Sequence, residues 1–258
     1  MSTSLQPPYD PLPPVPAFPQ AMAPAVREAA ARGGHVLDSP VWTALGGAHR
    51  HLGVELGLAR RYRDEVAPFA ALSDAADPRA WTDLAELVGP GGTVTLVGVE
   101  QLPEGWSGEP IQGVQLVATT VRGERDAEAV ALGAADVPEM LDLVARTRPG
   151  PFRPRTVETG SYVGIRRGGE LVAMAGERLS LPGWTEISAV CTDAGHRGQG
   201  LAGRLVRHVA AGIGARGDTP FLHSAAENPG AIRLYEALGF TRRRATVFHL
   251  VTAPGAAG

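Results

Sequence analysis

The chain has 258 residues, 44% of them hydrophobic, and a formal net charge of -3 at pH 7. That length suits one large domain or two small ones with a sizeable core. All 24 basic residues are arginine, which excludes enzymes that depend on a catalytic or phosphate-binding lysine, and the arginines form no stripe of the kind that binds nucleic acid or anionic membranes.

The amino-terminal half is predicted to be mixed α/β after a proline-rich start. Seven prolines fall within the first 20 residues, a density that favours extended polyproline conformations. Two helix starts, each a capping residue followed by proline, occur at Ser39-Pro40 and Asp77-Pro78. The predicted elements are helices over 40–57 and from 78 onward, and β-rich strands over 93–99 and 113–121.

The polar stretch 122–126 is predicted to be a boundary, after which a second mixed unit begins. Hydrophobic periodicity and turn residues predict the order β, α, β-hairpin, β, α, β, α, β for this half. The ranges are strand 130–132, a helix capped by Asp136, a hairpin of 161–167 and 171–181 joined at Gly168-Gly169, strand 184–192, helix 198–214, strand 220–225, helix 230–238 and strand 240–251.

A glycine-rich turn between strand 184–192 and the next helix is the most informative motif. The turn ends and the helix opens with Arg197, Gly198, Gln199, Gly200, Leu201 and Ala202. A helix start exposes free backbone N–H groups at its positive end, and glycines let a diphosphate approach the backbone closely. The pattern Arg-x-x-Gly-x-Ala resembles the pyrophosphate loop with which the GNAT acyltransferase superfamily binds acetyl-CoA.

A second motif at residues 228–240 supports the same family. Its Asn228, Ala231 and Tyr235, with the closing Gly239-Phe240, are similar to the superfamily's Asn-x-x-Ala-x-x-Leu-Tyr-Glu-x-x-Gly-Phe element. The two motifs identify this half as similar to a GNAT N-acetyltransferase. The resemblance implies an α/β (α+β) GNAT fold with a mixed central sheet. It also implies that acetyl-CoA is the cosubstrate, with Asn228, Ala231 and Tyr235 among the residues that bind it, and that there is no metal.

Two residues are candidates for the acid and base of acyl transfer. The thioester expels a thiolate, which gains from a nearby proton donor, while the attacking amine must be neutral. The resemblance implies that Tyr235 is the donor; the alternative is a buried aromatic side chain that only packs its helix. Glu186 lies 11 residues before Arg197, a spacing similar to the histone-acetyltransferase branch, where a strand glutamate is the base. Its alternative is a surface carboxylate on an edge strand.

The strand before the loop is expected to hold the pantetheine arm of the cosubstrate. In the family this arm pairs its amides with exposed strand backbone, here at Ala189, Val190 and Cys191, a form of strand addition. Cys191 is the one cysteine, which permits neither an internal disulfide nor a zinc cluster and is typical of a reducing compartment. No histidine is placed in sequence to activate it as a nucleophile, and direct transfer needs none.

Four further patterns have less specific interpretations. Residues 212–217 spell GxGxxG, but they end a helix, the reverse of a dinucleotide-binding turn. His49 and His51 would point about 200° apart in a helix, which disfavours a shared metal. The arginines at 242–244 are expected to begin a solvated strand, with an acidic substrate or the CoA 3′-phosphate as the alternative. The four-arginine segment 146–155, which walls the acceptor pocket in the superfamily, is expected either to be solvated or to bind a carboxylate.

The amino-terminal half resembles the amino-terminal halves of glycine N-acyltransferase-like members and is expected to be a degenerate GNAT-like unit. It lacks both motifs, so its expected role is to cover the sheet and shape the acceptor pocket, with Trp42 and Trp81 as buried anchors. The expected domains are a tail over 1–33, this half over 34–121, a linker over 122–126, the catalytic GNAT domain over 127–251 and a flexible tail over 252–258.

The expected function is direct transfer of an acetyl group from acetyl-CoA to an amine of a small molecule or peptide. The alternative is a non-catalytic acyl-CoA-binding or interaction module that kept the loop. No apolar run approaches the roughly 18 residues of a membrane span, and the first basic residue is Arg27, so no secretory signal is expected. We therefore expect a cytoplasmic protein without nucleic-acid or membrane partners, and a homodimer is left open.

Overall fold

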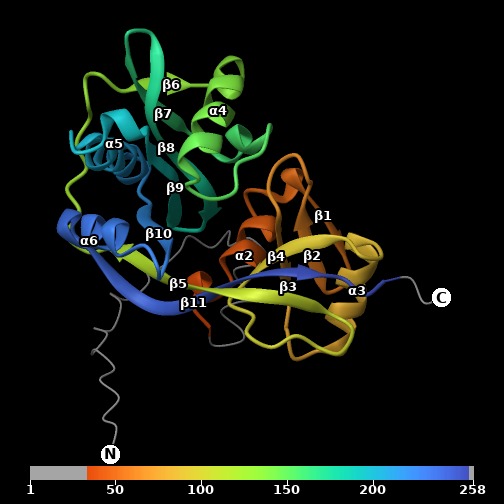
Figure 1. The fold of residues 1–258 in the computed structure, drawn as a ribbon. Coiled ribbons are helices and arrows are strands. Elements are labelled where there is room, and N and C mark those ends of the chain that lie inside the picture. The colour runs from red at the N-terminus through yellow and green to blue at the C-terminus, as the bar shows by residue number, and fades with distance from the viewer. Residues whose placement is uncertain (1–33, 256–258) are drawn as a thin grey trace, which may run out of the picture.

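The computed structural model describes residues 34–255, so the expected proline-rich tail lies outside the described residues. The strands of the described part form a single eleven-stranded sheet. Figure 1 shows this sheet spread over two lobes that are joined by two long strands, with helices packed against it. The α/β fold class predicted from the sequence is confirmed.

The carboxyl-terminal lobe follows the predicted order of elements. These are β6 (Val130–Leu132), α4 (Val137–Thr147), β7 (Tyr162–Arg167), β8 (Glu170–Leu181), β9 (Trp184–Thr192), α5 (Leu201–Ala215), β10 (Thr219–Ala225), α6 (Pro229–Leu238) and β11 (Phe240–Thr252). Strands β6 to β9 pair antiparallel, whereas β10 pairs parallel with β9, and only with residues 184–186. Beyond these residues the two strands diverge, which leaves one edge of β9 without a strand partner among the described residues.

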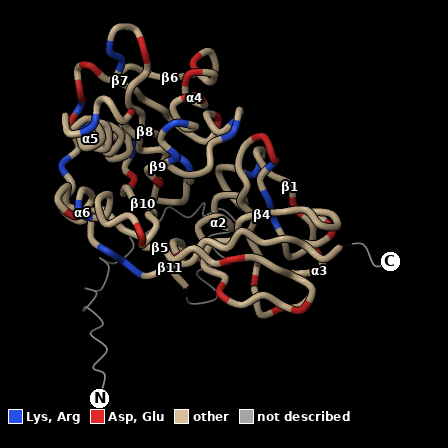
Figure 2. Tube along the Cα trace, in the orientation of Figure 1, with Lys and Arg blue, Asp and Glu red and all other residues tan. Residues whose placement is uncertain are grey.

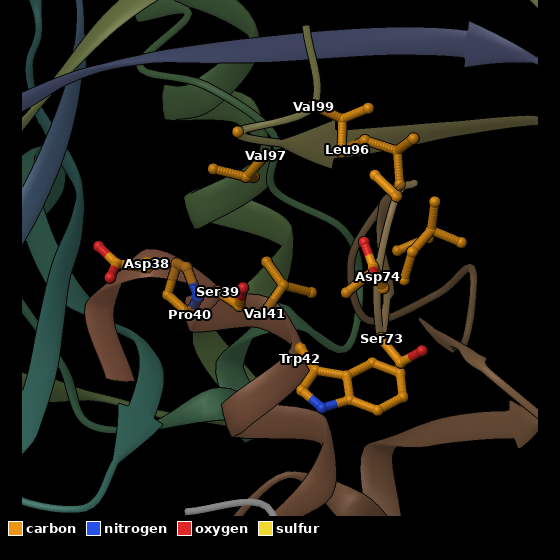
Figure 3. A pocket seen from close by; sticks show the side chains of 15 residues that line it. Asp38, Ser39, Pro40, Val41, Trp42, Ser73, Asp74, Leu96, Val97 and Val99 are labelled. Atoms are coloured by element: carbon orange, nitrogen blue, oxygen red, sulfur yellow. The ribbon is translucent and has the colours of Figure 1, made fainter. Parts of the chain in front are cut away.

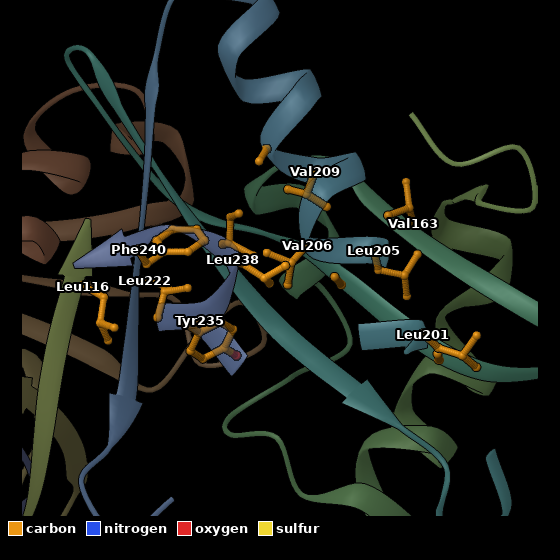
Figure 4. Close-up of a cluster of buried hydrophobic side chains, with 14 of the residues drawn as sticks. Leu116, Val163, Leu201, Leu205, Val206, Val209, Leu222, Tyr235, Leu238 and Phe240 are labelled. Carbon is orange, nitrogen blue, oxygen red and sulfur yellow. The ribbon is translucent and has the colours of Figure 1, made fainter. Parts of the chain in front are cut away.

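Helices α5 and α6 pack on the diverging strands through one buried apolar cluster. Leu201, Leu205 and Val206 of α5 share this cluster with Tyr235 of α6 and Leu222 of β10 (Figure 4). Burial of a side chain of this size stabilises a fold by about 1.5–3 kcal/mol. Because Leu201 is the first residue of α5, the cluster holds the start of this helix beside the end of β9.

The amino-terminal lobe repeats part of this order. Its elements are η1 (Val36–Asp38), α2 (Pro40–Gly46), η2 (Arg50–Leu52), β1 (Gly53–Leu56), β2 (Ala59–Tyr62), β3 (Phe69–Leu72), α3 (Pro78–Val88) and β4 (Thr93–Val97). Strands β1, β2 and β3 pair antiparallel in turn, and after helix α3 strand β4 pairs parallel with β3 over a few residues. In the other lobe β7, β8 and β9, helix α5 and strand β10 follow the same order. This order favours the prediction of a degenerate GNAT-like unit, which stays a prediction.

A cavity of about 330 Å³ lies in the amino-terminal lobe where β3 and β4 diverge. Figure 3 shows Trp42 of α2, Ser73 and Asp74 after β3, and Val97 and Val99 at the end of β4 around it. The cavity in this lobe and the gap between β9 and β10 in the other lobe therefore occupy corresponding positions, each beside a parallel strand pair that diverges.

Two long strands join the lobes. Strand β5 (Ser107–Ala118) comes from the amino-terminal half of the sequence, yet it pairs along its length with β11 and, from residue 113 on, with β10. Residues 248–252 of β11 pair in turn with β4. The order across the sheet is β1-β2-β3-β4-β11-β5-β10-β9-β8-β7-β6. The predicted boundary at 122–126 thus separates two stretches of sequence, while the sheet runs through both lobes.

The predicted helix over 40–57 is wrong beyond residue 46. Helix α2 ends at Gly46, and the N–H of Gly47 bonds to the carbonyl of Ala44. The chain then turns through η2 into β1, where a Cβ on Gly53 would lie 2.5 Å from the Leu45 side chain. Strand β1 therefore packs directly against α2, and the apolar residues at helical spacing belong to three short elements.

Other expectations on burial and termini have mixed outcomes. Trp42 and Trp81 are buried, at 6% and 5% exposure. Ala253 and Pro254 hydrogen-bond to the loop at Gly91 and Gly92, so the expected flexible tail over 252–258 is held in place as far as the structure describes it.

Charge and membrane features of the described residues are unremarkable. Acidic and basic positions are interspersed on both lobes in Figure 2. Within residues 34–255 no helix is long and apolar enough to cross a membrane. The same residues contain no group of three or more histidine, cysteine or acidic side chains placed to hold a metal ion.

Candidate active site

The predicted pyrophosphate loop lies at the start of α5, with Arg197 and Gln199 exposed. Gly198 and Gly200 have φ angles of 78° and 74°, and a Cβ at either position would meet nothing within 4 Å. Within the described residues the backbone N–H groups of 198–203 form no hydrogen bond, and no side chain caps the helix. These groups lie at the positive end of a helix and have no partner within the described residues, so they fit an anion such as a diphosphate.

The free edge of β9 lies next to this loop and contains the predicted pantetheine residues. Ala189 has a φ of 53°, where the pairing of β9 with β8 shifts register between Met174 and Gly176. A non-glycine residue in the left-handed region is strained, and such bulges re-aim the backbone near functional sites. Ala189, Val190 and Cys191 thus offer strand backbone on the side that β10 leaves open.

The second predicted motif forms the start of α6. Asn228 caps this helix, because its side-chain oxygen accepts a hydrogen bond of 3.1 Å from the N–H of Ala231. Tyr235 is 8% exposed in the apolar cluster, yet its hydroxyl makes no hydrogen bond within the described chain. Burial, with a contribution from Cys191, raises the pKa of Tyr235 to about 12. The hydroxyl therefore carries its proton at neutral pH.

Glu186 lies where β9 and β10 part, and it is completely buried. Arg178 of β8 donates two hydrogen bonds to its carboxylate, of 2.8 and 2.6 Å, and Nδ1 of His223 lies 2.7 Å from Oε1. Burial opposes ionisation, but the charge of Arg178 and the hydrogen bonds from Arg178 and His223 outweigh it and lower the pKa of Glu186 to about 2. The alternative of a surface carboxylate on an edge strand is therefore wrong.

Tyr235 and Glu186 approach the gap between the strands from opposite faces of the sheet. Side chains alternate along a strand, and Ile187 packs in the cluster that contains Tyr235. Glu186 therefore faces the amino-terminal lobe, where the guanidinium carbon of Arg178 lies 4.8 Å from the centre of the Phe69 ring of β3. A group held between β9 and β10 would have the hydroxyl on one side and the carboxylate on the other.

The arginine-rich segments are more strongly paired than expected. Arg243 is wrongly predicted as solvated: its side chain is 12% exposed and pairs with Asp38 at 2.6 Å. In the segment 146–155, Arg155 pairs with Glu65 of the amino-terminal lobe at 2.8 Å. This contact ties the expected wall of the acceptor pocket to the other lobe.

The GxGxxG pattern and the histidine pair lie outside the candidate site. Residues 212–217 end α5, which stops at Ala215, as predicted. His49 lies in a turn rather than a helix and contacts the hydroxyl of Tyr62 at 2.8 Å.

Three residues around Glu186 were not predicted from the sequence, namely Arg178, His223 and Gln115. They lie on three strands, and Gln115 comes from the other half of the chain. The available signal was a polar residue between apolar neighbours, as in Gln115 between Val114 and Leu116, and that signal does not identify a partner.

Comparisons with known proteins identify relatives of this chain. Residues 162–249 match the FR47-like protein family. The N-alpha-acetyltransferase RimI of Mycobacterium tuberculosis (strain ATCC 25618 / H37Rv) is 33% identical over a region that covers 45% of this chain and 82% of that protein.

Solved structures share the architecture as well. A structure from Novosphingobium aromaticivorans DSM 12444, assigned to the GNAT family of acetyltransferases, is 43% identical with a TM-score of 0.78, and the match covers 85% of this chain and 99% of that chain. A GCN5-related N-acetyltransferase from Kribbella flavida is 22% identical with a TM-score of 0.54, over 92% of this chain and 98% of the other, and shows the shared fold. The RimI relative, the structure from Novosphingobium aromaticivorans and the family match together show that the chain is an acyltransferase and belongs to the GNAT superfamily of N-acetyltransferases.

Proposed function

We propose that the chain transfers the acetyl group of acetyl-CoA directly to a primary amine of a small molecule or peptide. The observation that carries this proposal is the set of unpaired N–H groups at residues 198–203 beside the free edge of β9. A diphosphate needs such donors, and an extended pantetheine arm needs such an edge. Similarity to an N-alpha-acetyltransferase supports an amine acceptor.

The site offers a place for each part of the cosubstrate. Acetyl-CoA, when bound, supplies the thioester that the acceptor amine attacks. The diphosphate would be held by Arg197, Gly198, Gln199, Gly200, Leu201 and Ala202. The pantetheine arm would be held by the backbone of Ala189, Val190 and Cys191, while Asn228 and Ala231 fix the start of α6.

Tyr235 is proposed as the proton donor to the departing sulfur. Its hydroxyl is protonated at neutral pH and unpaired within the described chain, and it belongs to the helix that packs beside the gap. Cys191 has no proposed chemical role beyond its backbone, because burial raises the pKa of its thiol and a protonated thiol is a weak nucleophile. A protonated hydroxyl at Tyr235 and a protonated thiol at Cys191 both support direct transfer of the acetyl group to the amine, without an acylated cysteine.

Glu186 is proposed as a fixed negative charge that favours an amine near the gap. A carboxylate with a pKa of about 2 is a weak proton acceptor at neutral pH, which disfavours the direct base suggested by the family resemblance. The pH dependence of turnover in Glu186→Gln separates the two roles. Loss of a base lowers turnover most at low pH and less as the amine loses its own proton, whereas loss of a fixed charge lowers it across the range.

The decisive experiment combines binding and turnover. We expect acetyl-CoA at about 100 times its dissociation constant to stabilise the protein by about 2.7 kcal/mol, and free CoA thiol to be released only when amines or peptides are added. Stabilisation without release under a broad pool of amines would favour the acyl-CoA-binding module instead. No thermal shift at millimolar acetyl-CoA would refute the proposal.

The amino-terminal lobe is proposed to shape the acceptor pocket, because it faces Glu186 and is tied to the segment 146–155 through Arg155 and Glu65. A cytoplasmic location and a homodimer remain predictions. Separate assays with free amino compounds and with short peptides determine which acceptor class is used.

A further inference from the structure

A row of buried polar side chains crosses the sheet on the face toward the amino-terminal lobe. It extends over five neighbouring strands, β8, β9, β10, β5 and β11. Its members, which we call the polar row, are Arg178, Glu186, His223, Gln115 and Arg243. Glu186 is 0% exposed and Gln115 2%, and the side chain of His223 is 2% exposed. Buried polar side chains destabilise a fold unless each donor has an acceptor and each acceptor a donor.

Hydrogen bonds join each member of the polar row to the next. The distances are 2.6 Å from Arg178 to Glu186, 2.7 Å from Glu186 to His223, 3.0 Å from His223 to Gln115 and 2.8 Å from Gln115 to Arg243. Arg243 then donates to Asp38 of η1 at 2.6 Å. The polar row therefore connects the point where β9 and β10 part with the amino-terminal lobe.

The guanidinium at the Arg243 end determines the direction of these bonds. A guanidinium only donates, so Gln115 turns its side-chain oxygen to Arg243. The amide nitrogen of Gln115 then donates to the carbonyl of Leu37 at 2.9 Å and to Nε2 of His223. Because Nε2 accepts this bond, the proton of His223 lies on Nδ1, where it is donated to Glu186.

We propose that Gln115 is a positioning residue for acetyl transfer, which holds His223 in its Nδ1–H tautomer so that His223 and Arg178 keep the carboxylate of Glu186 oriented beside the gap. The proposal rests on the proposed function. A proton on Nε2 of His223 would face the N–H of the Gln115 amide, and two donors facing each other in a buried network are unfavourable. The Nδ1–H tautomer is therefore fixed for as long as Gln115 and Arg243 stay in place. The carboxylate of one lobe thus depends on a residue supplied by the other half of the chain.

The test uses two substitutions of Gln115 in the full-length protein. Gln115→Glu keeps the shape but removes both N–H donors, so Nε2 of His223 faces an acceptor. Gln115→Met removes the amide altogether. Gln112→Glu is the matched control, because Gln112 is an exposed residue of the same strand and undergoes the same chemical change.

The first readout is the ¹⁵N spectrum of the histidine rings, with the His223 signals identified by their loss in His223→Gln. We expect a proton on Nδ1 alone in the wild type, and protons on both ring nitrogens in Gln115→Glu at neutral pH. A wild-type proton on Nε2, or a His223 spectrum unchanged by Gln115→Glu, overturns the proposal. This readout needs no enzyme activity, so it decides the inference even when no acceptor is turned over and the proposed function fails.

The second readout is steady-state kinetics with acetyl-CoA and an accepted amine. We expect kcat to fall about tenfold or more in both Gln115 variants, since small misplacements of active-site groups have effects of this size, while the KM for acetyl-CoA changes less than about twofold. The thermal shift with acetyl-CoA verifies that each variant is folded. Values of kcat within about twofold of the wild type in a folded variant overturn the proposal, and Gln115→Glu keeps it testable when Gln115→Met does not fold.

Discussion

In each lobe a pair of parallel strands parts after a few residues, but the loop that follows is different. After β9, two glycines with positive φ leave the N–H groups of 198–203 unpaired at the start of α5. After β3, the carboxylate of Asp77 accepts a hydrogen bond of 2.9 Å from the N–H of Arg79 at the start of α3, and Asp74 accepts one from Ala76. At the start of α3, a side-chain carboxylate therefore occupies the position that a bound anion would take at a helix start.

Similar strand geometry is thus followed by two different kinds of loop in one chain. The gap in the carboxyl-terminal lobe is bordered by the unpaired N–H groups that we propose as an anion site, whereas the cavity in the amino-terminal lobe is bordered by Asp38 and Asp74. The amino-terminal lobe contributes instead through contacts at the sheet, with Phe69 over Arg178 and Gln115 in the polar row. The difference between the lobes thus lies in the loops, and substitutions in these loops test it.

The largest effect on acetyl-CoA binding is expected for Gly200→Val. A branched side chain at a φ of 74° distorts the loop and projects into the space of the diphosphate, so stabilisation by acetyl-CoA, about 2.7 kcal/mol at 100 times the dissociation constant, should be lost. Differential scanning fluorimetry with and without acetyl-CoA measures this loss.

The matched control is Gly91→Val in the amino-terminal lobe. Gly91 also has a positive φ, of 67°, and open space around a Cβ, so the backbone cost of about 1–2 kcal/mol is similar. The response to acetyl-CoA should persist in this variant. Equal loss in both variants would contradict the assignment of the anion site to α5.

Tyr235→Phe should retain acetyl-CoA binding while kcat falls by roughly 10²–10⁴, the range for loss of a general acid. The corresponding change in the other lobe is Tyr62→Phe, which removes a hydroxyl bonded to His49. That variant should lose about 1 kcal/mol of stability with little change in kcat. Steady-state kinetics and denaturant unfolding make the comparison, and full kcat in Tyr235→Phe would mean that the thiolate leaves unaided.

Much of the fold of the carboxyl-terminal half could be predicted from the sequence, because its elements are long enough to show a period. Strand β9 has the predicted bounds of 184 and 192. Helix α5 begins at Leu201 rather than at 198, since the positive φ angles of Gly198 and Gly200 place these glycines in the loop. Strands β1, β2 and β3 have four residues each, too few for alternation to be recognised.

The candidate site was predictable where its residues lie in one local motif, and not where they meet across the sheet. The loop 197–202 and the start of α6 are each continuous in sequence. By contrast, Gln115 and His223 are 108 residues apart, and their contact depends on the insertion of β5 between β10 and β11. No periodicity within either strand predicts that insertion.

Glu186→Gln should destabilise the fold by about 3–5 kcal/mol, because it leaves Arg178 buried without a counter-charge. The pKa of Glu186 is lowered from its usual 4.5 to about 2 in the folded protein. Its contribution to stability is therefore complete above pH 4.5 and is lost as the pH falls toward 2. Denaturant unfolding at several pH values should show a steeper decline for the wild type than for the variant in this window, and parallel declines would contradict the assignment.

The smallest effect is expected for Asp77→Ala, which opens the start of α3 without making a glycine loop there. Loss of the hydrogen bond to the N–H of Arg79 should cost about 1 kcal/mol, as is usual for an N-cap. Freed N–H groups alone do not recreate the other lobe's site, because Asp74 keeps a carboxylate in the same turn, bonded to the N–H of Ala76, and this strand-to-helix turn lacks glycine. The acetyl-CoA thermal shift should therefore stay as in the wild type and fit a single binding site. A second, weaker binding event in calorimetry would instead mean that the cap carboxylate alone separates the two lobes.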